Sequence, residues 1–278
     1  MIVFLNGEFV PEERAVVSVF DRSFRYGDGL FETLLAVNGK LFRWEQHWAR
    51  LHNSADFFKL TIPCSAAEML AAAQELLRRN TLADAMLRIQ ISRGSGPRGY
   101  APTGNESPVI VMTAHPAPSR TAHAWKLTVC PLRVAATDQI LGHKTGNRLP
   151  QILAAMHARE NGADEALLVN TLDHVCEGST SNVFWIRGGV IGTPPLLPNV
   201  LPGVTRAVVF EAARALGVRC EEQPLRVEEL VECEGVFLTL TSRGVVEAAS
   251  LDGKQLLKSP ITQSLRDAYE SLLARECA

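Results

Sequence analysis

The 278-residue sequence lacks several features that would place it in a specialised class of protein. It has no uncharged apolar run long enough to span a bilayer. Its net charge is only -2, and Lys and Arg are interspersed with Asp and Glu instead of forming the basic field that nucleic acids require. We therefore expect neither membrane insertion nor nucleic-acid binding. With 46% hydrophobic and 21% charged residues, the composition is that of an ordinary globular chain with room for two domains.

Cysteine pairs and metal-ligand spacings are also missing. The six cysteines are scattered without a Cys-x-x-Cys pair, which is typical of reduced thiols. His47 and His52 would lie on different faces of a helix, with no carboxylate to complete a ligand set. The N-terminus has neither the basic start nor the cleavage site of a secretion signal. The sequence therefore predicts a cytoplasmic location and no metal site.

Residues 1–115 have the pattern of a small α+β domain. Asn6-Gly7 and Asn38-Gly39 each separate two apolar runs, and such pairs accept the positive φ angles of a tight hairpin turn. Ser65 and Glu68 form a capping-box pattern at a helix start. The predicted elements are strands at 2–5, 8–10, 30–37 and 41–42, helices at about 44–60 and 65–80, and strands at 86–92 and 109–113.

A proline-containing linker is predicted at 116–121, followed by a larger α/β domain at 122–278. Its predicted elements are a strand at 127–132, a helix at about 149–161, strands at 165–170, 174–177 and 183–186, a helix from 202 to 217, a strand at 235–240 and a helix from about 260.

Lys144 lies in a glycine-flanked loop that is not a nucleotide-binding P-loop, because His143 stands where that motif needs glycine. Alone, Lys144 would be interpreted as a solvated loop residue. Downstream, Glu177 ends a strand before a Gly/Ser turn, and Gly203-Val204-Thr205 opens a helix. Free N–H groups and the helix dipole at such a start favour a phosphate, although an ordinary helix start has the same sequence. Cys176 alternates to the opposite strand face from Glu177 and is predicted to be a packed thiol.

Four ordered segments carry a family resemblance. They are Lys144-Thr145-Gly146-Asn147-Arg148-Leu149, Ala163-Asp164-Glu165-Ala166-Leu167-Leu168, Glu177-Gly178-Ser179-Thr180-Ser181-Asn182-Val183-Phe184 and Leu201-Pro202-Gly203-Val204-Thr205-Arg206. Their succession resembles the class IV (fold type IV) pyridoxal-phosphate family, which includes branched-chain and D-amino-acid aminotransferases and 4-amino-4-deoxychorismate lyase. The resemblance implies a D-amino-acid-aminotransferase-like α/β fold, with pyridoxal 5'-phosphate between an α+β N-terminal domain and a larger α/β C-terminal domain, and a homodimer.

The resemblance also implies a role for each matched position. Lys144 would hold the cofactor as an imine, Glu177 would pair with its pyridine nitrogen and keep the ring electron-withdrawing, and Arg50 would clamp its phosphate. The other implied cofactor contacts are Asn182, Leu201, Gly203, Val204, Thr205 and Thr241. Without the resemblance, these positions would be interpreted as turn, helix and core residues.

Two segments favour the lyase within this family. Lys-x-x-Asn-Arg-Leu at Lys144, and Ser-Arg-Gly-Ser-Gly-Pro-Arg-Gly-Tyr over 92–100, both resemble lyase motifs. Arg98 would bind a substrate carboxylate across a dimer interface, with Tyr100 on the same loop. The candidate proton donors to the departing group are Lys144 itself and its neighbours Thr33 and Tyr26.

The expected reaction is lysis of 4-amino-4-deoxychorismate to 4-aminobenzoate and pyruvate, in the folate pathway, with Lys144 as general base. Other features favour an aminotransferase acting on D-amino acids, branched-chain amino acids or amines. The turn at 177–182 reads like that of the aminotransferases, and D-amino-acid enzymes also place an arginine at the position of Arg98. Both reactions would use the same cofactor site.

Overall fold

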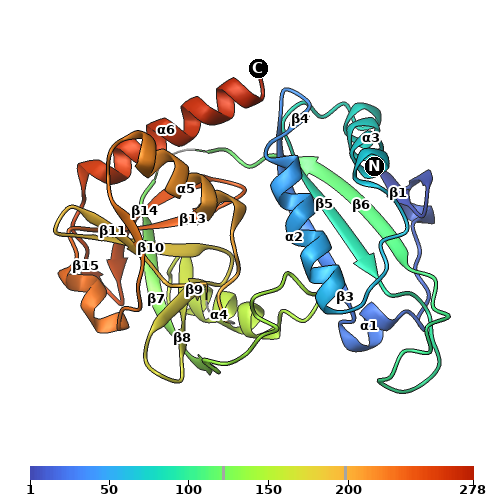
Figure 1. The fold of residues 1–278 in the computed structure, drawn as a ribbon, viewed down its shortest axis with the longest axis horizontal. Coiled ribbons are helices and arrows are strands. Elements are labelled where there is room, and N and C mark those ends of the chain that lie inside the picture. Colours follow the sequence, from blue (N-terminus) through green and yellow to red (C-terminus); the bar gives the residue numbers. More distant parts are fainter. Residues whose placement is uncertain (121–122, 197–198) are drawn as a thin grey trace. The chain divides into compact units, whose positions relative to one another are not determined.

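The structure is a computed structural model that describes residues 1–120, 123–196 and 199–278. It divides into two compact units, drawn in Figure 1. The N-terminal unit comprises Met1–Ser119, Lys144–Asn147 and Glu276–Ala278, and the C-terminal unit comprises Arg120–His143 and Arg148–Arg275. The domain limits predicted from the sequence stay a prediction, and residues 121 and 122, where the predicted linker meets the second domain, lie outside the described residues.

The N-terminal unit is built on a six-stranded antiparallel sheet of order β2-β1-β6-β5-β3-β4. Its strands are β1 (Ile2–Leu5), β2 (Glu8–Pro11), β3 (Gly29–Val37), β4 (Lys40–Leu41), β5 (Ala85–Ser92) and β6 (Val109–Pro116). Its helices are α1 (Arg22–Tyr26), α2 (Trp44–Phe57) and α3 (Ala66–Arg79), with a 3-10 turn η1 (Glu12–Arg14). Helix α2 contacts β3, and α3 contacts β1 and β6.

Local sequence explains most of these elements. Asn6 and Gly7 have φ angles of 51° and 95°, and Asn38 and Gly39 have 52° and 75°, as the predicted hairpin turns require. Ser65 caps α3 in the predicted capping box with Glu68. Apolar residues of the helices pack against apolar residues of the sheet and form one buried core. It includes Leu51, Met69 and Leu76 from the helices and Leu34, Leu87 and Ile89 from the strands. The predicted strands and helices of this unit are confirmed, to within a few residues at their ends.

The C-terminal unit is built on a mixed nine-stranded sheet of order β12-β11-β10-β13-β14-β7-β8-β9, with β15 beside β14. Its strands are β7 (Trp125–Val134), β8 (Glu165–Asn170), β9 (Val175–Gly178), β10 (Asn182–Arg187), β11 (Val190–Thr193), β12 (Cys220–Glu222), β13 (Gly235–Leu240), β14 (Gly244–Leu251) and β15 (Lys254–Gln255). Its helices are α4 (Leu149–Glu160), α5 (Val204–Ala215) and α6 (Pro260–Glu276), with a 3-10 helix η2 (Val227–Glu232).

Strands β10 and β13 lie at the centre of this sheet and are almost continuously buried. That explains their unbroken apolar runs, because a strand covered on both faces has no polar alternation. Strand β14 was missed by the sequence prediction. Its Glu and Ala residues disfavour strands, but pairing on both sides with β13 and β7 overrides this propensity.

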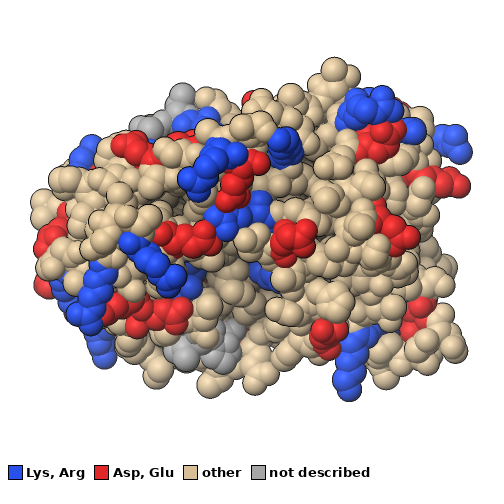
Figure 2. Space-filling model, turned by 45° about the horizontal axis from the view of Figure 1, so that its top comes forward, with Lys and Arg blue, Asp and Glu red and all other residues tan. Residues whose placement is uncertain are grey.

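The described residues contain no helix that is both long and apolar enough to cross a membrane. On the face drawn in Figure 2, basic and acidic side chains are intermingled and form no extended field of one sign.

Candidate active site

Lys144 is fixed to the sheet of the N-terminal unit. Its carbonyl accepts a hydrogen bond from the N–H of Phe31 on β3 at 2.9 Å, and Gly146 N–H donates to the Gly29 carbonyl at 2.8 Å. The half-buried side chain places Nζ 4.8 Å from the centroid of the Phe31 ring. The lysine therefore stands on a short extended segment held by a strand, and not on a free loop.

The face of β3 that carries Phe31 holds a second cation, which the sequence did not reveal. Arg88 on β5 lies directly opposite Thr33, two residues along the same face as Phe31. The guanidinium carbon of Arg88 is 3.9 Å from the centroid of the Phe31 ring, the ring that Lys144 also contacts. Partial burial lowers the pKa of Arg88 from its usual value. Thr33, Lys144 and Arg88 are thus brought around one aromatic side chain.

The opposite face of β3 carries a buried charge cluster. Glu32 accepts a bidentate pair of hydrogen bonds from Arg50 on α2, from Nε to Oε1 at 2.7 Å and from Nη2 to Oε2 at 2.7 Å. His47, one helical turn before Arg50, has Nδ1 2.8 Å from Glu32 Oε2. All three side chains are buried. The orientation of the predicted phosphate-binding arginine is therefore set by a carboxylate that sequence reasoning missed.

Electrostatics determine the charge states in this cluster. Burial alone would raise the pKa of Glu32, but the Arg50 charge and the hydrogen bonds from His47 and Arg50 hold that pKa far below its usual range. Burial lowers the pKa of His47, against the raising effect of Glu32, and the charges of Arg50 and Lys144 lower it further. The cluster is therefore an ionised Arg50–Glu32 pair with a neutral imidazole that donates from Nδ1.

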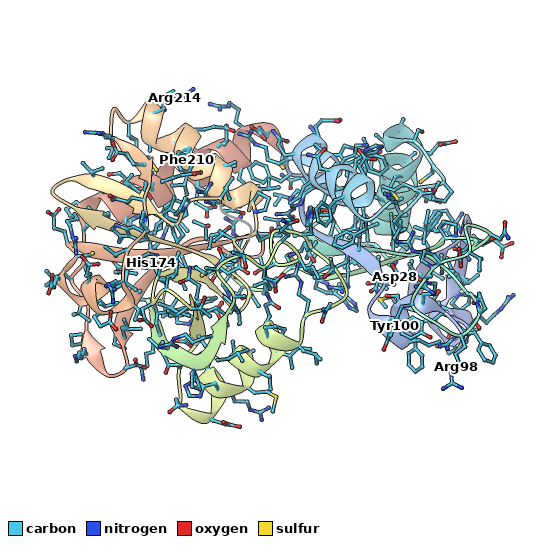
Figure 3. The ribbon with its side chains drawn as sticks, turned by 60° about the horizontal axis from the view of Figure 1, so that its bottom comes forward. Asp28, Arg98, Tyr100, His174, Phe210 and Arg214 are labelled. Carbon is cyan, nitrogen blue, oxygen red and sulfur yellow. The ribbon has the colours of Figure 1, made fainter. Side chains whose placement is uncertain are left out.

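Helix α1 and the loop that follows β5 hold the remaining predicted residues of this unit. The Tyr26 and Tyr100 rings meet edge to face with centroids 5.5 Å apart, and the Tyr26 hydroxyl accepts a hydrogen bond from the Gly99 N–H at 3.3 Å. Arg98 and Tyr100 are exposed, and Figure 3 labels them at the outer end of the unit, with Asp28 further in. The structure thus brings Tyr26 and Tyr100 into contact.

In the C-terminal unit, three predicted residues meet around one stretch of backbone. The buried carboxylate of Glu177, near the end of β9, accepts a hydrogen bond from the Leu201 N–H at 3.0 Å. Asn182, at the start of β10, donates from Nδ2 to the Leu201 carbonyl at 2.9 Å. A Cβ on Gly203 would lie 2.0 Å from Asn182 Oδ1, so this position accepts only glycine without rearrangement. Glu177, Asn182, Leu201 and Gly203 therefore form one packed group.

Helix α5 begins directly after this group. Gly203 is its N-cap residue and makes no side-chain capping bond, so the N–H groups of the first turn are not satisfied by a cap. Val204 and Thr205 in that turn are buried. Thr241 comes immediately after β13, the strand that α5 contacts. This start has the form of an anion-binding helix terminus.

Glu165 binds the turn between Glu177 and Asn182, a role that the sequence analysis did not predict. Its buried carboxylate accepts hydrogen bonds from the N–H groups of Ser179 and Thr180 at 2.9 and 3.1 Å. It also accepts from the hydroxyls of Thr180 and Ser181 at 2.9 and 3.0 Å, and from the Ser179 hydroxyl. The three consecutive hydroxyl residues of this turn are therefore explained by one carboxylate.

Each unit holds its own share of the predicted residues. The N-terminal unit contains Tyr26, Thr33, Arg50, Arg98, Tyr100 and Lys144. The C-terminal unit contains Glu177, Asn182, Leu201, Gly203, Val204, Thr205 and Thr241. A buried carboxylate that accepts a backbone hydrogen bond and an uncapped helix start fit a phosphorylated pyridine, and a strand-bound lysine fits an aldehyde. Among the residues that the structure describes, no three His, Cys, Asp or Glu side chains are grouped to hold a metal ion.

Comparison with known sequences identifies the family. The sequence model of the amino-transferase class IV family matches residues 29–251. A Methanocaldococcus jannaschii protein, provisionally named a branched-chain-amino-acid aminotransferase, is 34% identical and covers 98% of this chain and 96% of its own. The D-alanine aminotransferase of Staphylococcus epidermidis is 32% identical, with 98% and 97% covered.

Solved structures agree on the fold. A branched-chain aminotransferase from Thermoproteus uzoniensis superposes with a TM-score of 0.92 at 32% identity, covering 99% of this chain and 96% of that chain. A Legionella pneumophila structure provisionally named 4-amino-4-deoxychorismate lyase superposes with a TM-score of 0.87 at 26% identity, covering 96% and 98%. The predicted fold class is confirmed. The chain belongs to the class IV aminotransferase family and is a pyridoxal-phosphate-dependent enzyme of that family.

Proposed function

We propose that this enzyme is a 4-amino-4-deoxychorismate lyase that forms 4-aminobenzoate and pyruvate. The observation that carries the proposal is the loop from Ser92 to Tyr100, which has the lyase-like sequence and displays an exposed Arg98 beside Tyr100. The likeness to the Legionella structure supports it.

In the proposal, each part of the cofactor is assigned to residues of this chain. Lys144 Nζ would bind its aldehyde carbon, and Glu177 would face the pyridine nitrogen. Arg50, the N–H groups that open α5, Thr205 and Thr241 would bind the phosphate, while Leu201 would pack on the ring. Bound pyridoxal 5'-phosphate supplies an electron sink for the bonds broken at the substrate.

The charges of the substrate suit the arginines of the N-terminal unit. Aminodeoxychorismate has two carboxylates, one on the ring and one on the enolpyruvyl group. Arg88 lies on the face of β3 where Lys144 stands, and Arg98 is displayed on the loop. In the proposal, Arg88 binds one carboxylate and Arg98 of the partner subunit binds the other, so that the C4 proton is oriented toward the amine of Lys144.

The proton transfers follow from this orientation. The amine of Lys144 would remove the C4 proton as general base. The electron pair of that C–H bond aromatises the ring as the C–O bond to the enolpyruvyl group breaks. Protonation of the departing enolpyruvate carbon gives pyruvate, with Lys144, Tyr26 or Thr33 as the candidate donors predicted from the sequence.

Amino transfer is the second candidate function. The relatives named above as branched-chain and D-alanine aminotransferases favour it, as does the hydroxyl-rich turn at 179–181. In that reaction Lys144 would return the proton to the cofactor carbon, and a keto acid would leave. The amino donor would be a branched-chain amino acid, a D-amino acid or an amine.

We also infer a cytoplasmic homodimer. Strongly exposed apolar side chains, which mark interaction surfaces, follow η1 along the chain and continue into α1. They are Val16, Val17, Val19, Phe20 and Phe24. All six cysteines are free, which suits a reducing compartment. Sedimentation of the purified protein at micromolar concentration should give twice the chain mass, and a monomer would contradict the inference.

The test separates the two reactions by their need for an acceptor. Purified enzyme is mixed with enzymatically made aminodeoxychorismate without any keto acid, and separately with L-leucine or D-alanine plus 2-oxoglutarate. Pyruvate and 4-aminobenzoate in the first mixture support the lyase, whereas amino transfer without lysis would reject it. Lys144→Ala should lower either rate on the order of 10²- to 10⁴-fold, the usual contribution of a positioned acid or base.

A further inference from the structure

One carboxylate, that of Asp28, binds the first residue of the loop that displays Arg98 and also binds Arg22 on α1. Asp28 Oδ2, between α1 and β3, accepts a hydrogen bond from Arg22 Nε at 2.7 Å and from Arg93 Nε at 2.9 Å. Arg93 is the first residue of the loop after β5. Burial alone would raise the pKa of Asp28, but the hydrogen bonds from Arg93 and Arg22 and their charges lower it. We call Asp28, Arg22 and Arg93 the loop clamp.

Arg22 also binds the loop backbone directly after Arg98. Its Nη1 donates to the Gly99 carbonyl at 3.1 Å, and its Nη2 donates to the Tyr100 carbonyl at 2.5 Å. The side chain is 3% exposed, although guanidinium groups are rarely so buried unless paired. One buried arginine thus joins the carboxylate of Asp28, which also binds Arg93 at the beginning of the loop, to the two residues that follow Arg98.

Arg93 ties the beginning of the loop to the body of the unit. It donates to the carbonyls of Phe58 and Lys59 at 2.8 and 2.7 Å, and its N–H donates to the Asp28 carbonyl at 3.2 Å. The next residue, Gly94, has a φ of 99°, and a Cβ there would lie 1.9 Å from the Ser107 carbonyl oxygen. The returning chain therefore packs directly on the loop's start.

We propose that the loop clamp sets the position of Arg98 and Tyr100, and thereby the affinity for the substrate carboxylate. The inference rests on the proposed function, because it takes Arg98 as a substrate contact. Three glycines within 94–99 would leave the loop many conformations in the absence of ties. A guanidinium recognises a carboxylate well only when it is held in orientation, so the clamp residues are positioning residues that act through Arg98.

The proposal is tested with Arg22→Gln and Asp28→Asn, with the exposed Arg14→Gln as the matched surface control. The first readout is cleavage by trypsin after Arg98, followed by fragment mass, because cleavage tracks how often the loop opens. Both clamp variants should be cut at least about tenfold faster than wild type, and Arg14→Gln at the wild-type rate. Cleavage rates that stay at the wild-type value in both clamp variants would overturn the proposal.

The second readout is the separation of KM from kcat on the substrate identified above, with Arg98→Gln as reference. Arg98→Gln should raise KM about tenfold while kcat stays within about twofold, and the clamp variants should do the same. If Arg98→Gln leaves KM unchanged, the role of Arg98 in the proposed function fails, while the trypsin rates still report on the clamp. If Arg98→Gln raises KM and the clamp variants do not, the clamp proposal fails alone.

A conservative variant covers the case in which Arg22→Gln does not fold. Arg22→Lys keeps the charge beside Asp28 but cannot span the carboxylate and both carbonyls in the way that a planar guanidinium does. It should therefore give an intermediate trypsin rate and an intermediate KM. An Arg22→Lys protein that matches wild type in both measurements would contradict the role assigned to the Gly99 and Tyr100 hydrogen bonds.

Discussion

The N-terminal unit builds its part of the candidate site from paired charged side chains, whereas the C-terminal unit builds its part from backbone groups and hydroxyls. In the first, Arg50 is held by Glu32 through two hydrogen bonds of 2.7 Å. In the second, Glu165 is satisfied by N–H and O–H groups of a single turn, and Glu177 accepts from a backbone N–H.

The two units should therefore respond differently when a buried group is replaced. A buried ion pair is destabilising when one partner is removed, because the other charge is left uncompensated. A carboxylate bound by neutral donors loses only the hydrogen bonds that its replacement cannot accept. We therefore expect substitutions in the N-terminal unit to affect folding strongly, and substitutions in the C-terminal unit to affect cofactor binding more than folding.

The largest stability effect is expected for Glu32→Gln. It leaves the buried guanidinium of Arg50 without its carboxylate, so the free energy of unfolding should fall by about 3–5 kcal/mol in urea denaturation. Glu45→Gln, exposed in the first turn of α2, is the control and should change stability little. If both variants unfold at the same urea concentration, the N-terminal unit does not depend on its buried pair.

The buried charge cluster of the N-terminal unit should also make the stability of the protein depend on pH. The pKa of folded Glu32 lies below its ordinary value of 4.5, so its stabilising contribution is present above about pH 4.5 and is lost as the pH falls toward the folded pKa. His47 acts in the same direction, because its pKa is lowered from 6.5 and the unfolded state takes up its proton first. Wild-type stability should therefore fall below about pH 6, and Glu32→Gln should show a shallower decline between pH 4.5 and 2.

An intermediate effect is expected for Gly203→Ala. The added Cβ meets Asn182 Oδ1, so the start of α5 must shift, and we expect cofactor affinity to fall by about 1–3 kcal/mol with a smaller change in unfolding. Equilibrium titration of the apoenzyme with pyridoxal 5'-phosphate measures this change. Adding Asn182→Ala to Gly203→Ala should restore part of the lost affinity, and a purely additive double variant would reject the proposed contact.

A smaller effect is expected for Glu165→Gln. The amide oxygen still accepts hydrogen bonds, but its NH₂ group faces donors, so one or two bonds to the Ser179–Ser181 turn are lost. Cofactor affinity should fall by about 1–2 kcal/mol, while the exposed Glu160→Gln has no effect. If Glu165→Gln lowered the free energy of unfolding as much as Glu32→Gln does, the expected difference between the two units would be wrong.

The smallest effect is expected for Cys176→Ala. Burial, and then the nearby charge of Glu177, raise the pKa of this thiol to about 12, so it is not a nucleophile. The variant should keep wild-type activity within about twofold, and native Cys176 should resist alkylation at pH 8. Rapid alkylation of Cys176 in the folded enzyme would contradict its assignment as a packed thiol.

The structural features that could be predicted are those that depend on residues close together in the sequence. The Asn-Gly turns and the Ser65–Glu68 capping box depend only on near neighbours, so their helices and strands were predicted to within a few residues. The candidate site residues followed from ordered motifs, but their partners did not. Glu32 and Arg50 are 18 positions apart, and Arg22 and Tyr100 are 78 apart. Such pairings depend on how strands and helices pack, which the single sequence did not reveal.

Lys144 is proposed to carry the cofactor, and borohydride reduction can identify the lysine that does so. Reduction of the holoenzyme should fix the cofactor covalently to one lysine, which tryptic digestion and mass spectrometry then locate. We predict a modified peptide that contains Lys144, and none in Lys144→Ala. Modification of a different lysine, or none in the wild-type holoenzyme, would contradict the account.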